Sequence, residues 1–153
     1  MKRSRGSTRS FLLDNNVFVA AIAHPRRETG TLRLILHLIE DDEVRLVGNI
    51  YLAEEMIRYT EVYPSETATL LIEALASKME FVDVEAKYLK ICRGFIGTSD
   101  PSDVAHAATC LQARSTLIGD DRHFDKIRDE GIIDVWGTKR AFDELLGSST
   151  THL

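Results

Sequence analysis

Short apolar runs alternate along the chain with longer segments in which apolar residues recur every three or four positions. The first pattern is typical of strands buried on both faces, and the second of helices with one buried side. The short runs predict about five strands, at residues 11–13, 44–47, 80–84, 116–118 and 132–136. The periodic segments predict helices at residues 17–23, 31–42, 51–63, 66–78, 86–95, 103–113, 123–130 and 138–146.

This alternation of strands and helices predicts one three-layer α/β/α domain, with a parallel sheet covered by helices on both faces. We expect the domain to span residues 10–146, between a basic tail at residues 1–9 and a short tail at residues 147–153. In such sheets, ligands bind beyond the carboxyl ends of the strands, where the strand order reverses. The residues that directly follow each strand are therefore the candidates for chemistry.

Composition narrows the class of protein. The chain has 153 residues, of which 44% are hydrophobic and 28% charged, as in a soluble globular domain. No apolar stretch approaches the ~20 residues that span a bilayer, and Cys92 and Cys110 form no CxxC pair, so we expect a cytoplasmic protein with no membrane partner. The net charge of −5 argues against binding nucleic acid by overall positive charge, but it allows a nuclease whose carboxylates bind cations.

Two of the predicted strands are followed by aspartates. Asp14 follows the strand at residues 11–13, and Asp120 and Asp121 follow the strand at residues 116–118. If these strands are neighbours, the carboxylates repel one another, and a bound divalent cation such as Mg²⁺ would remove the repulsion. The alternative for each acid alone is a cap on the helix that follows it. The occurrence of acids after both strands favours the metal site.

A third acid lies in the segment "SDPSDVAHAATCLQA". Asp100 has the character of an N-cap, Pro101 suits the first helical position, and Asp103 falls at the third position. Asp103 could complete a capping arrangement or share a cation at the strand ends. Asp103, His106 and Cys110 also lie along one side of the helix, but a zinc site needs a fourth ligand at suitable spacing. We therefore interpret His106 as a packed or hydrogen-bonded helix residue.

The fourth acid is Glu54 or Glu55. A turn of about 100° per residue places Glu55 beside the apolar stripe that includes Leu52 and Met56. The same geometry places Glu54 on the far side, four residues from Arg58, where it would form a surface ion pair. An acidic side chain at the boundary of the core is unusual, so we choose Glu55 as the fourth acid of the predicted site.

These motifs together resemble those of the PIN-domain nucleases, the group that includes the VapC-type toxins of toxin–antitoxin pairs. "FLLDNNVFVAA", "YLAEEM", "DPSDVAHAA" and "LIGDDRHF" occur in the family's order, and the resemblance covers roughly residues 10–146. It implies a five-stranded parallel sheet in the order 3-2-1-4-5. The catalytic and metal-binding acids implied by the motifs are Asp14, Glu55, Asp103 and Asp121, with Asp120 as an alternative ligand and Asn16 in support.

The resemblance also implies an activity, which is metal-dependent hydrolysis of phosphodiester bonds in single-stranded RNA. One or two Mg²⁺ or Mn²⁺ ions would activate water and stabilise the leaving oxygen. Arg122 is the nearest cation for a substrate phosphate, with Arg26 and Arg27 further off. The implied partners are the RNA, an antitoxin protein and a second copy of the chain in a homodimer. One departure is Gly119, which stands where many members have Thr or Ser.

Other functions stay open at this point. A toxin and an RNA-processing nuclease are equally compatible with the motifs. A PIN-like scaffold that binds RNA or protein without cutting is the non-enzymatic alternative, although all four acids are present. A haloacid-dehalogenase-like phosphatase also begins with an Asp at a strand end, but it needs a second Asp where this chain has Asn16.

Overall fold

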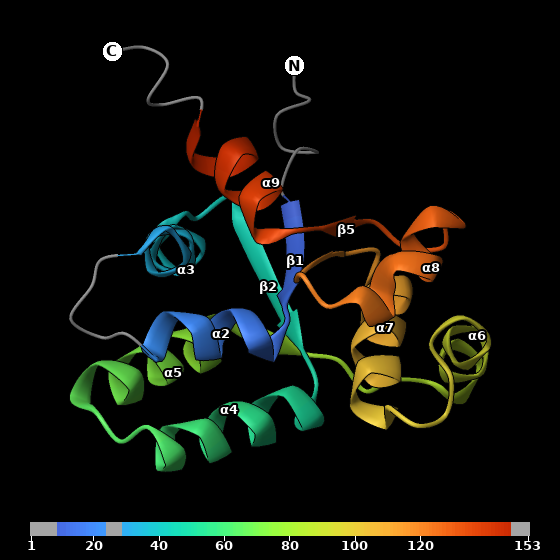
Figure 1. Ribbon diagram of the computed structural model, residues 1–153, viewed down its shortest axis with the longest axis horizontal. Helices are drawn as coiled ribbons and strands as arrows, with labels where there is room; N and C mark the ends of the chain where they lie inside the picture. Colours follow the sequence, from blue (N-terminus) through green and yellow to red (C-terminus); the bar gives the residue numbers. More distant parts are fainter. Residues whose placement is uncertain (1–8, 24–28, 148–153) are drawn as a thin grey trace.

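Five parallel strands form one sheet in the order β3-β2-β1-β4-β5 (Figure 1). The computed structural model describes residues 9–23 and 29–147 of the chain. The strands are β1 (Arg9–Leu13), β2 (Val44–Gly48), β3 (Met79–Phe81), β4 (Thr116–Ile118) and β5 (Val135–Trp136). The predicted strand order and parallel direction are confirmed, so the chain reverses its direction of winding beside β1.

Helices cover both faces of this sheet, which confirms the three-layer prediction (Figure 1). On one side lie α2 (Asn15–Ile22), α3 (Gly30–Glu40), α4 (Ile50–Val62), α5 (Glu66–Lys78) and α9 (Thr138–Phe142). On the other side lie α6 (Ala86–Ile96), α7 (Pro101–Ala113) and α8 (Asp125–Asp129). Two short segments, η1 (Arg122–Phe124) and η2 (Asp143–Gly147), precede α8 and follow α9.

The core sits around β1, because this central strand is covered by helices on both sides. Phe11, Leu12 and Leu13 expose 1%, 0% and 1% of their surface, so both faces of the strand are buried. A strand buried on both faces needs apolar residues without alternation, and this explains the continuous run in the sequence. No helix among the described residues is both long and apolar enough to cross a lipid bilayer.

The helices agree with the predicted segments except near the carboxyl end. The helix predicted at residues 123–130 is divided into η1 and α8, because the side chain of Asp121 accepts the His123 N–H at 2.9 Å and tightens the turn. The last strand starts at Val135 because the N–H of Ile132 still bonds back to Ile127 (3.1 Å) in the turn after α8. The closing helix widens into the π-helical turn η2.

The tail boundaries that we predicted stay predictions. β1 begins at Arg9 and η2 ends at Gly147, whereas residues 1–8 and 148–153 lie outside the described residues. The two cysteines, Cys92 and Cys110, are both buried and unpaired.

Lys78, the last residue of α5, joins this helix to the end of α3. Its Nζ donates hydrogen bonds to the backbone oxygens of Leu38, Ile39 (3.2 Å) and Asp41 (2.7 Å). The last carbonyls of a helix have no partner within the helix, and a cation there also interacts favourably with the helix dipole. One side chain therefore closes α3 and fixes α5 against it.

We predict that Lys78→Met lowers the free energy of unfolding by about 1–3 kcal/mol, because three buried or half-buried carbonyls lose their donor. Urea unfolding measures the change. Lys90→Met on the exposed side of α6 is the matched control and should stay within about 0.5 kcal/mol of the parent chain. Equal effects of the two substitutions would contradict this role of Lys78.

Candidate active site

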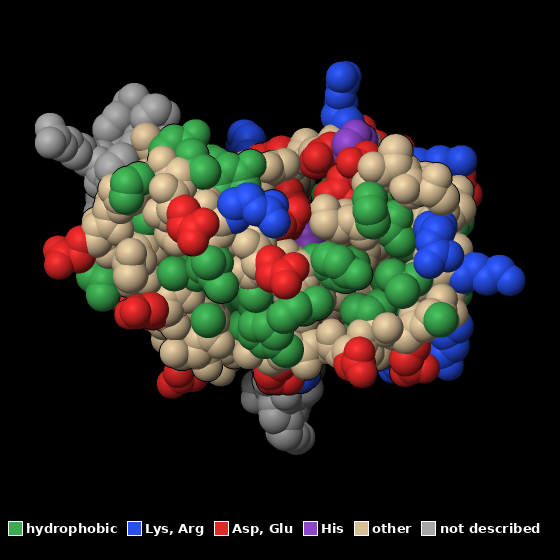
Figure 2. All heavy atoms as spheres, turned by 90° about the horizontal axis from the view of Figure 1, so that it is seen from below, with side chains coloured by type: hydrophobic (Ala, Val, Ile, Leu, Met, Phe, Trp, Pro, Cys, Tyr) green, Lys and Arg blue, Asp and Glu red, His purple; other side chains and the backbone are tan. Residues whose placement is uncertain are grey.

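Acidic side chains gather at the edge of the sheet where the strands end. Figure 2 looks onto this edge and shows Asp and Glu side chains around a hollow. Asp14 directly follows β1, and Asp121 lies three residues after β4. Because β1 pairs with β4 through Leu13 and Ile118, these two acids come from neighbouring strand ends. Asp103 comes from the first turn of α7, and Glu55 from the second turn of α4.

Asp14 is buried, with 3% of its surface exposed, and it is not a helix cap in the usual sense. It occupies the N-cap position of α2, but its side chain makes no capping hydrogen bond. Its Oδ2 atom is buried and has no hydrogen-bond partner among the residues that the structure describes. Burial raises the pKa of Asp14 from 3.8 to about 6; His106 opposes this rise, and the charges of Asp103 and Asp121 add to it. A buried carboxylate oxygen without a partner is what a bound cation would satisfy.

Gly119 allows β4 to approach Asp14 closely. A Cβ atom at position 119 would lie 2.9 Å from the Cβ of Asp14 and 3.4 Å from its Oδ2. A threonine or serine side chain therefore has no room in this arrangement. The departure noted at this position has a local steric reason, because the Asp14 side chain itself fills the space.

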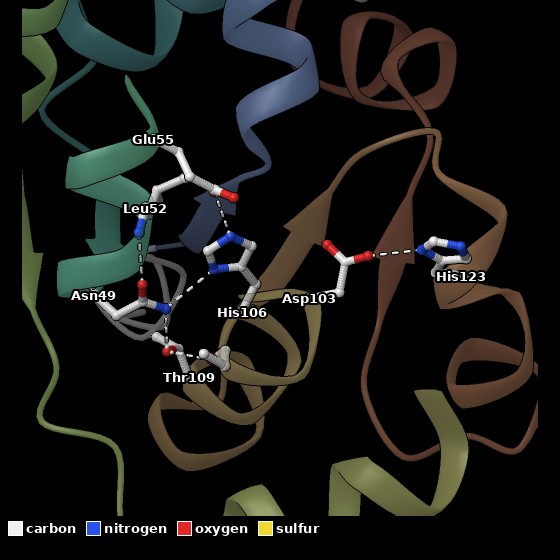
Figure 3. A network of polar contacts seen from close by, with 8 residues as sticks. Asn49, Leu52, Glu55, Asp103, His106, Thr109 and His123 are labelled. Carbon is white, nitrogen blue, oxygen red and sulfur yellow. Dashed lines mark hydrogen bonds and ion pairs between the residues drawn. The ribbon is translucent and has the colours of Figure 1, made fainter. Parts of the chain in front are cut away.

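Glu55 faces the site, whereas Glu54 is exposed on the outer side of α4. The Glu55 side chain is 24% exposed, and its Oε1 accepts a hydrogen bond from Nε2 of buried His106 at 3.0 Å (Figure 3). Burial raises the pKa of Glu55, but hydrogen bonds from His106 and Ser102 outweigh it and hold the pKa below its ordinary value. Glu55 is therefore ionised at neutral pH.

His123 stands among three carboxylates on the other side of the site. Its Nδ1 lies 2.8 Å from Oδ2 of Asp103, 3.3 Å from Oδ2 of Asp100 and 3.4 Å from Oδ1 of Asp121. The hydrogen bond with Asp103 and the charges of Asp121 and Asp100 raise the pKa of His123. Burial also raises the pKa of Asp103, the bond from His123 lowers it, and the Asp121 charge adds to the rise. His123 thus offsets negative charge that three acids share.

Asp120 faces away from these groups. Its two carboxylate oxygens accept the backbone N–H of Thr138 at 2.9 Å and the hydroxyl of Thr138 at 2.7 Å, so it holds the start of α9. Asn16 and Arg122, the predicted supporting and substrate-binding residues, are both exposed. Arg26 and Arg27 lie outside the described residues.

The donors suit a divalent cation. Among the residues that the structure describes, Asp100, Asp103 and His123 present ligand atoms that all lie within 4.8 Å of one another. Of the four predicted acids, Asp103 alone belongs to this group, and Glu55 is turned toward His106. Carboxylate oxygens are the ligands that suit Mg²⁺ or Mn²⁺. The charges of Asp103 and Asp121 both act on Asp14, whose buried Oδ2 has no hydrogen-bond partner among the described residues.

A model of the PIN-domain family matches residues 11–130. The chain belongs to the PIN-domain family. PIN domains are nucleases that typically use divalent metal ions, in keeping with the acids at the strand ends of this PIN domain. Its order 3-2-1-4-5 and its acid-bearing strand ends agree with that membership.

Solved structures share the fold of this PIN domain. One matching chain is from the crystal structure of VapBC2 from Rickettsia felis bound to a DNA fragment from their promoter. The TM-score is 0.55 and the identity 18%, over 84% of this chain and 98% of that chain. At this level of identity, the likeness shows that the two chains share a fold. A search of curated proteins gave no match.

Sequence reasoning missed two residues at this site. His123 lies two positions after Asp121, and an imidazole so close to an acidic turn was the available signal. The sequence predicts only a capping role for Asp100. Asp100 does occupy the N-cap position of α7, but its side chain makes no capping hydrogen bond and lies beside His123 instead. Both omissions arise because the partners come from different elements.

We predict that Asp14→Asn changes the pH dependence of stability in the metal-free protein. A carboxyl group whose folded pKa is raised stabilises the fold below its unfolded pKa of 3.8, and this contribution is lost as the pH rises through about 6. The free energy of unfolding of the variant, relative to the parent chain, should therefore increase by about 2–3 kcal/mol between pH 4 and pH 7.5. Urea unfolding with EDTA at both pH values measures this, and a pH-independent difference would contradict it.

We also predict that Gly119→Ala weakens Mn²⁺ binding by about tenfold or more, because the added Cβ must displace Asp14 or the end of β4. Titration of Mn²⁺ against the metal-free protein measures the affinity. Gly94→Ala is the control, since a Cβ there meets no atom of the described part of the chain within 4 Å. Unchanged affinity in a folded Gly119→Ala protein would show that the position of Asp14 does not matter for the metal.

Proposed function

We propose that this PIN domain is a metal-dependent ribonuclease that hydrolyses phosphodiester bonds of single-stranded RNA. The observation that carries the proposal is the buried, partnerless Oδ2 of Asp14 beside the charges of Asp103 and Asp121. Such a group lowers stability in the absence of a cation, and this is typical of sites whose residues serve function.

Asp14, Asp103 and Asp121 are the proposed metal ligands, with Glu55 as the fourth acid. One or two Mg²⁺ or Mn²⁺ ions, when bound, supply an activated water and stabilise the leaving oxygen of the phosphodiester. Asp121 is preferred over Asp120, because both oxygens of Asp120 are occupied by Thr138. Glu55 is preferred over Glu54, because it faces the site and bonds to His106, whereas Glu54 is exposed on the outer side of α4.

The other side chains at this edge have supporting roles in the proposal. Ionised Glu55 can accept a hydrogen bond from the attacking water and orient it. His123 offsets the charge of Asp100, Asp103 and Asp121 before a cation binds, and Arg122 is exposed next to it for contact with a substrate phosphate. Asn16 would contact water at the rim, since its side chain is exposed.

A role as the toxin of a toxin–antitoxin pair is part of the same proposal. The likeness to a chain of the VapBC2 complex supports an antitoxin protein as partner. Two buried, unpaired cysteines are compatible with a reducing cytoplasm, where such a toxin would act. A homodimer, an RNA-processing role and a catalytically silent scaffold are the alternatives that biochemical tests must separate.

We predict that the purified protein cleaves end-labelled single-stranded RNA with Mn²⁺ or Mg²⁺ and not with EDTA. Asp103→Asn should reduce cleavage by about a hundredfold or more, because it removes a ligand charge. Asp134→Asn is the matched control, since this exposed aspartate precedes β5 at the opposite edge of the sheet. Single-stranded DNA of the same sequence tests the choice of RNA.

The outcomes distinguish the alternatives. Absence of both cleavage and a Mn²⁺-dependent rise in melting temperature would reject the metal site and favour the scaffold. A rise in melting temperature without cleavage would support the metal site and reject the chosen RNA as substrate. Cleavage that persists in Asp103→Asn would reject the assigned ligands.

A further inference from the structure

A chain of buried hydrogen bonds runs from the start of α4 through α7 to Glu55 (Figure 3). Asn49 is 2% exposed and His106 is 1% exposed. The Nδ2 of Asn49 lies 3.2 Å from Nδ1 of His106 and 2.9 Å from Oγ1 of Thr109. The Nε2 of His106 then lies 3.0 Å from Oε1 of Glu55. The predicted role of His106 as a hydrogen-bonded helix residue is thus confirmed, but its partner is a proposed active-site acid.

The direction of each hydrogen bond follows from groups that can only donate. The backbone N–H of Leu52 must donate, so the Asn49 atom that it meets at 2.8 Å is the amide oxygen. The amide NH₂ of Asn49 therefore faces His106 and Thr109, and it can only donate. The hydroxyl of Thr109 gives its own proton to the Ala105 carbonyl at 2.8 Å and is free to accept.

These directions assign one tautomer to His106. Because Nδ1 accepts from Asn49, it carries no proton, and the ring proton must be on Nε2. The Nε2–H then donates to the Glu55 carboxylate. The opposite tautomer would place an N–H against an NH₂ group and a bare nitrogen against a carboxylate, both in a buried setting where unpaired polar groups are costly.

We propose that His106 is a positioning residue, which holds the Glu55 carboxylate in one orientation toward the metal and water of the site, and that Asn49 sets its tautomer. This inference rests on the function proposed above and deepens it. Asn49 also caps α4, the helix that carries Glu55, so the same amide fixes both the helix and the imidazole. A glutamate that is 24% exposed would otherwise sample several rotamers, and this ordering removes that freedom.

Two substitutions at His106 distinguish the hydrogen bond at Nδ1 from the hydrogen bond at Nε2. The amide of His106→Gln can reach the place of Nε2 and donate to Glu55. The amide of His106→Asn is shorter and occupies the place of Nδ1, where it keeps Asn49 satisfied and leaves Glu55 without a donor. A purely structural histidine would lose stability in both variants, with no link to Glu55.

The test measures Mn²⁺ affinity of the metal-free protein by titration, together with kcat and KM for RNA cleavage. We expect His106→Asn to weaken Mn²⁺ binding or kcat by 10- to 100-fold, and His106→Gln to recover most of the loss. His37→Asn on α3 is the matched control and should leave both quantities unchanged. In a Glu55→Gln background, His106→Asn should have no further effect, because His106 acts through Glu55.

The outcomes of this test are distinct from those of the proposed function. If the parent chain neither binds Mn²⁺ nor cuts RNA, the proposed function and this inference both fall. If the parent chain binds Mn²⁺ and folded His106→Asn does so equally well with the same kcat, the positioning role alone falls. If the His106 variants do not fold, ¹⁵N NMR of the parent ring decides: a proton on Nε2 supports the inference, and a neutral ring protonated on Nδ1 overturns it.

Discussion

A carboxylate buried at the end of the central strand is the constraint on which the site depends. The second part of β1, residues 11–13, is apolar without alternation because helices cover both of its faces, and Asp14 is the first residue beyond it. At this point the side chain is still covered by the neighbouring elements, so its charge is held away from water and one oxygen has no partner. Burial at this strand end therefore disfavours the charged carboxylate unless a positive charge lies beside it.

Some neighbouring residues add negative charge around Asp14, and others donate hydrogen bonds to the acids of the site. Asp103 and Asp121 bring further negative charge, while Gly119 leaves the space that the Asp14 side chain needs. Two histidines act in the opposite sense: His106 donates a hydrogen bond to Glu55, and His123 lies within hydrogen-bonding distance of the acids Asp100, Asp103 and Asp121. Such an arrangement is unfavourable for stability by itself, and that is consistent with selection for binding a cation rather than for packing.

Much of the fold could be predicted because it depends on local patterns. The apolar runs located the strands, helical periodicity located the helices, and the alternation of the two gave a parallel sheet. Periodicity also separated Glu55 from Glu54, because helix geometry places one beside the buried stripe and the other on the exposed side. The prediction that Asp14 and the acids after β4 lie at neighbouring strand ends needed only the strand order.

Side-chain partnerships between distant segments could not be predicted in this way. Asp120 and Asp121 are adjacent in the sequence, but only the packing of α9 directs Asp120 to Thr138 and leaves Asp121 beside His123. The contact of Asn49 with His106 joins residues 57 positions apart. The sequence by itself determined which elements form and which of their faces are buried, since these follow from short-range periodicity. The tertiary structure decided which acids accept hydrogen bonds at a helix start, which acid has an oxygen without a partner, and which acids bond to a histidine. The reason is that these hydrogen bonds form only when separate elements pack together.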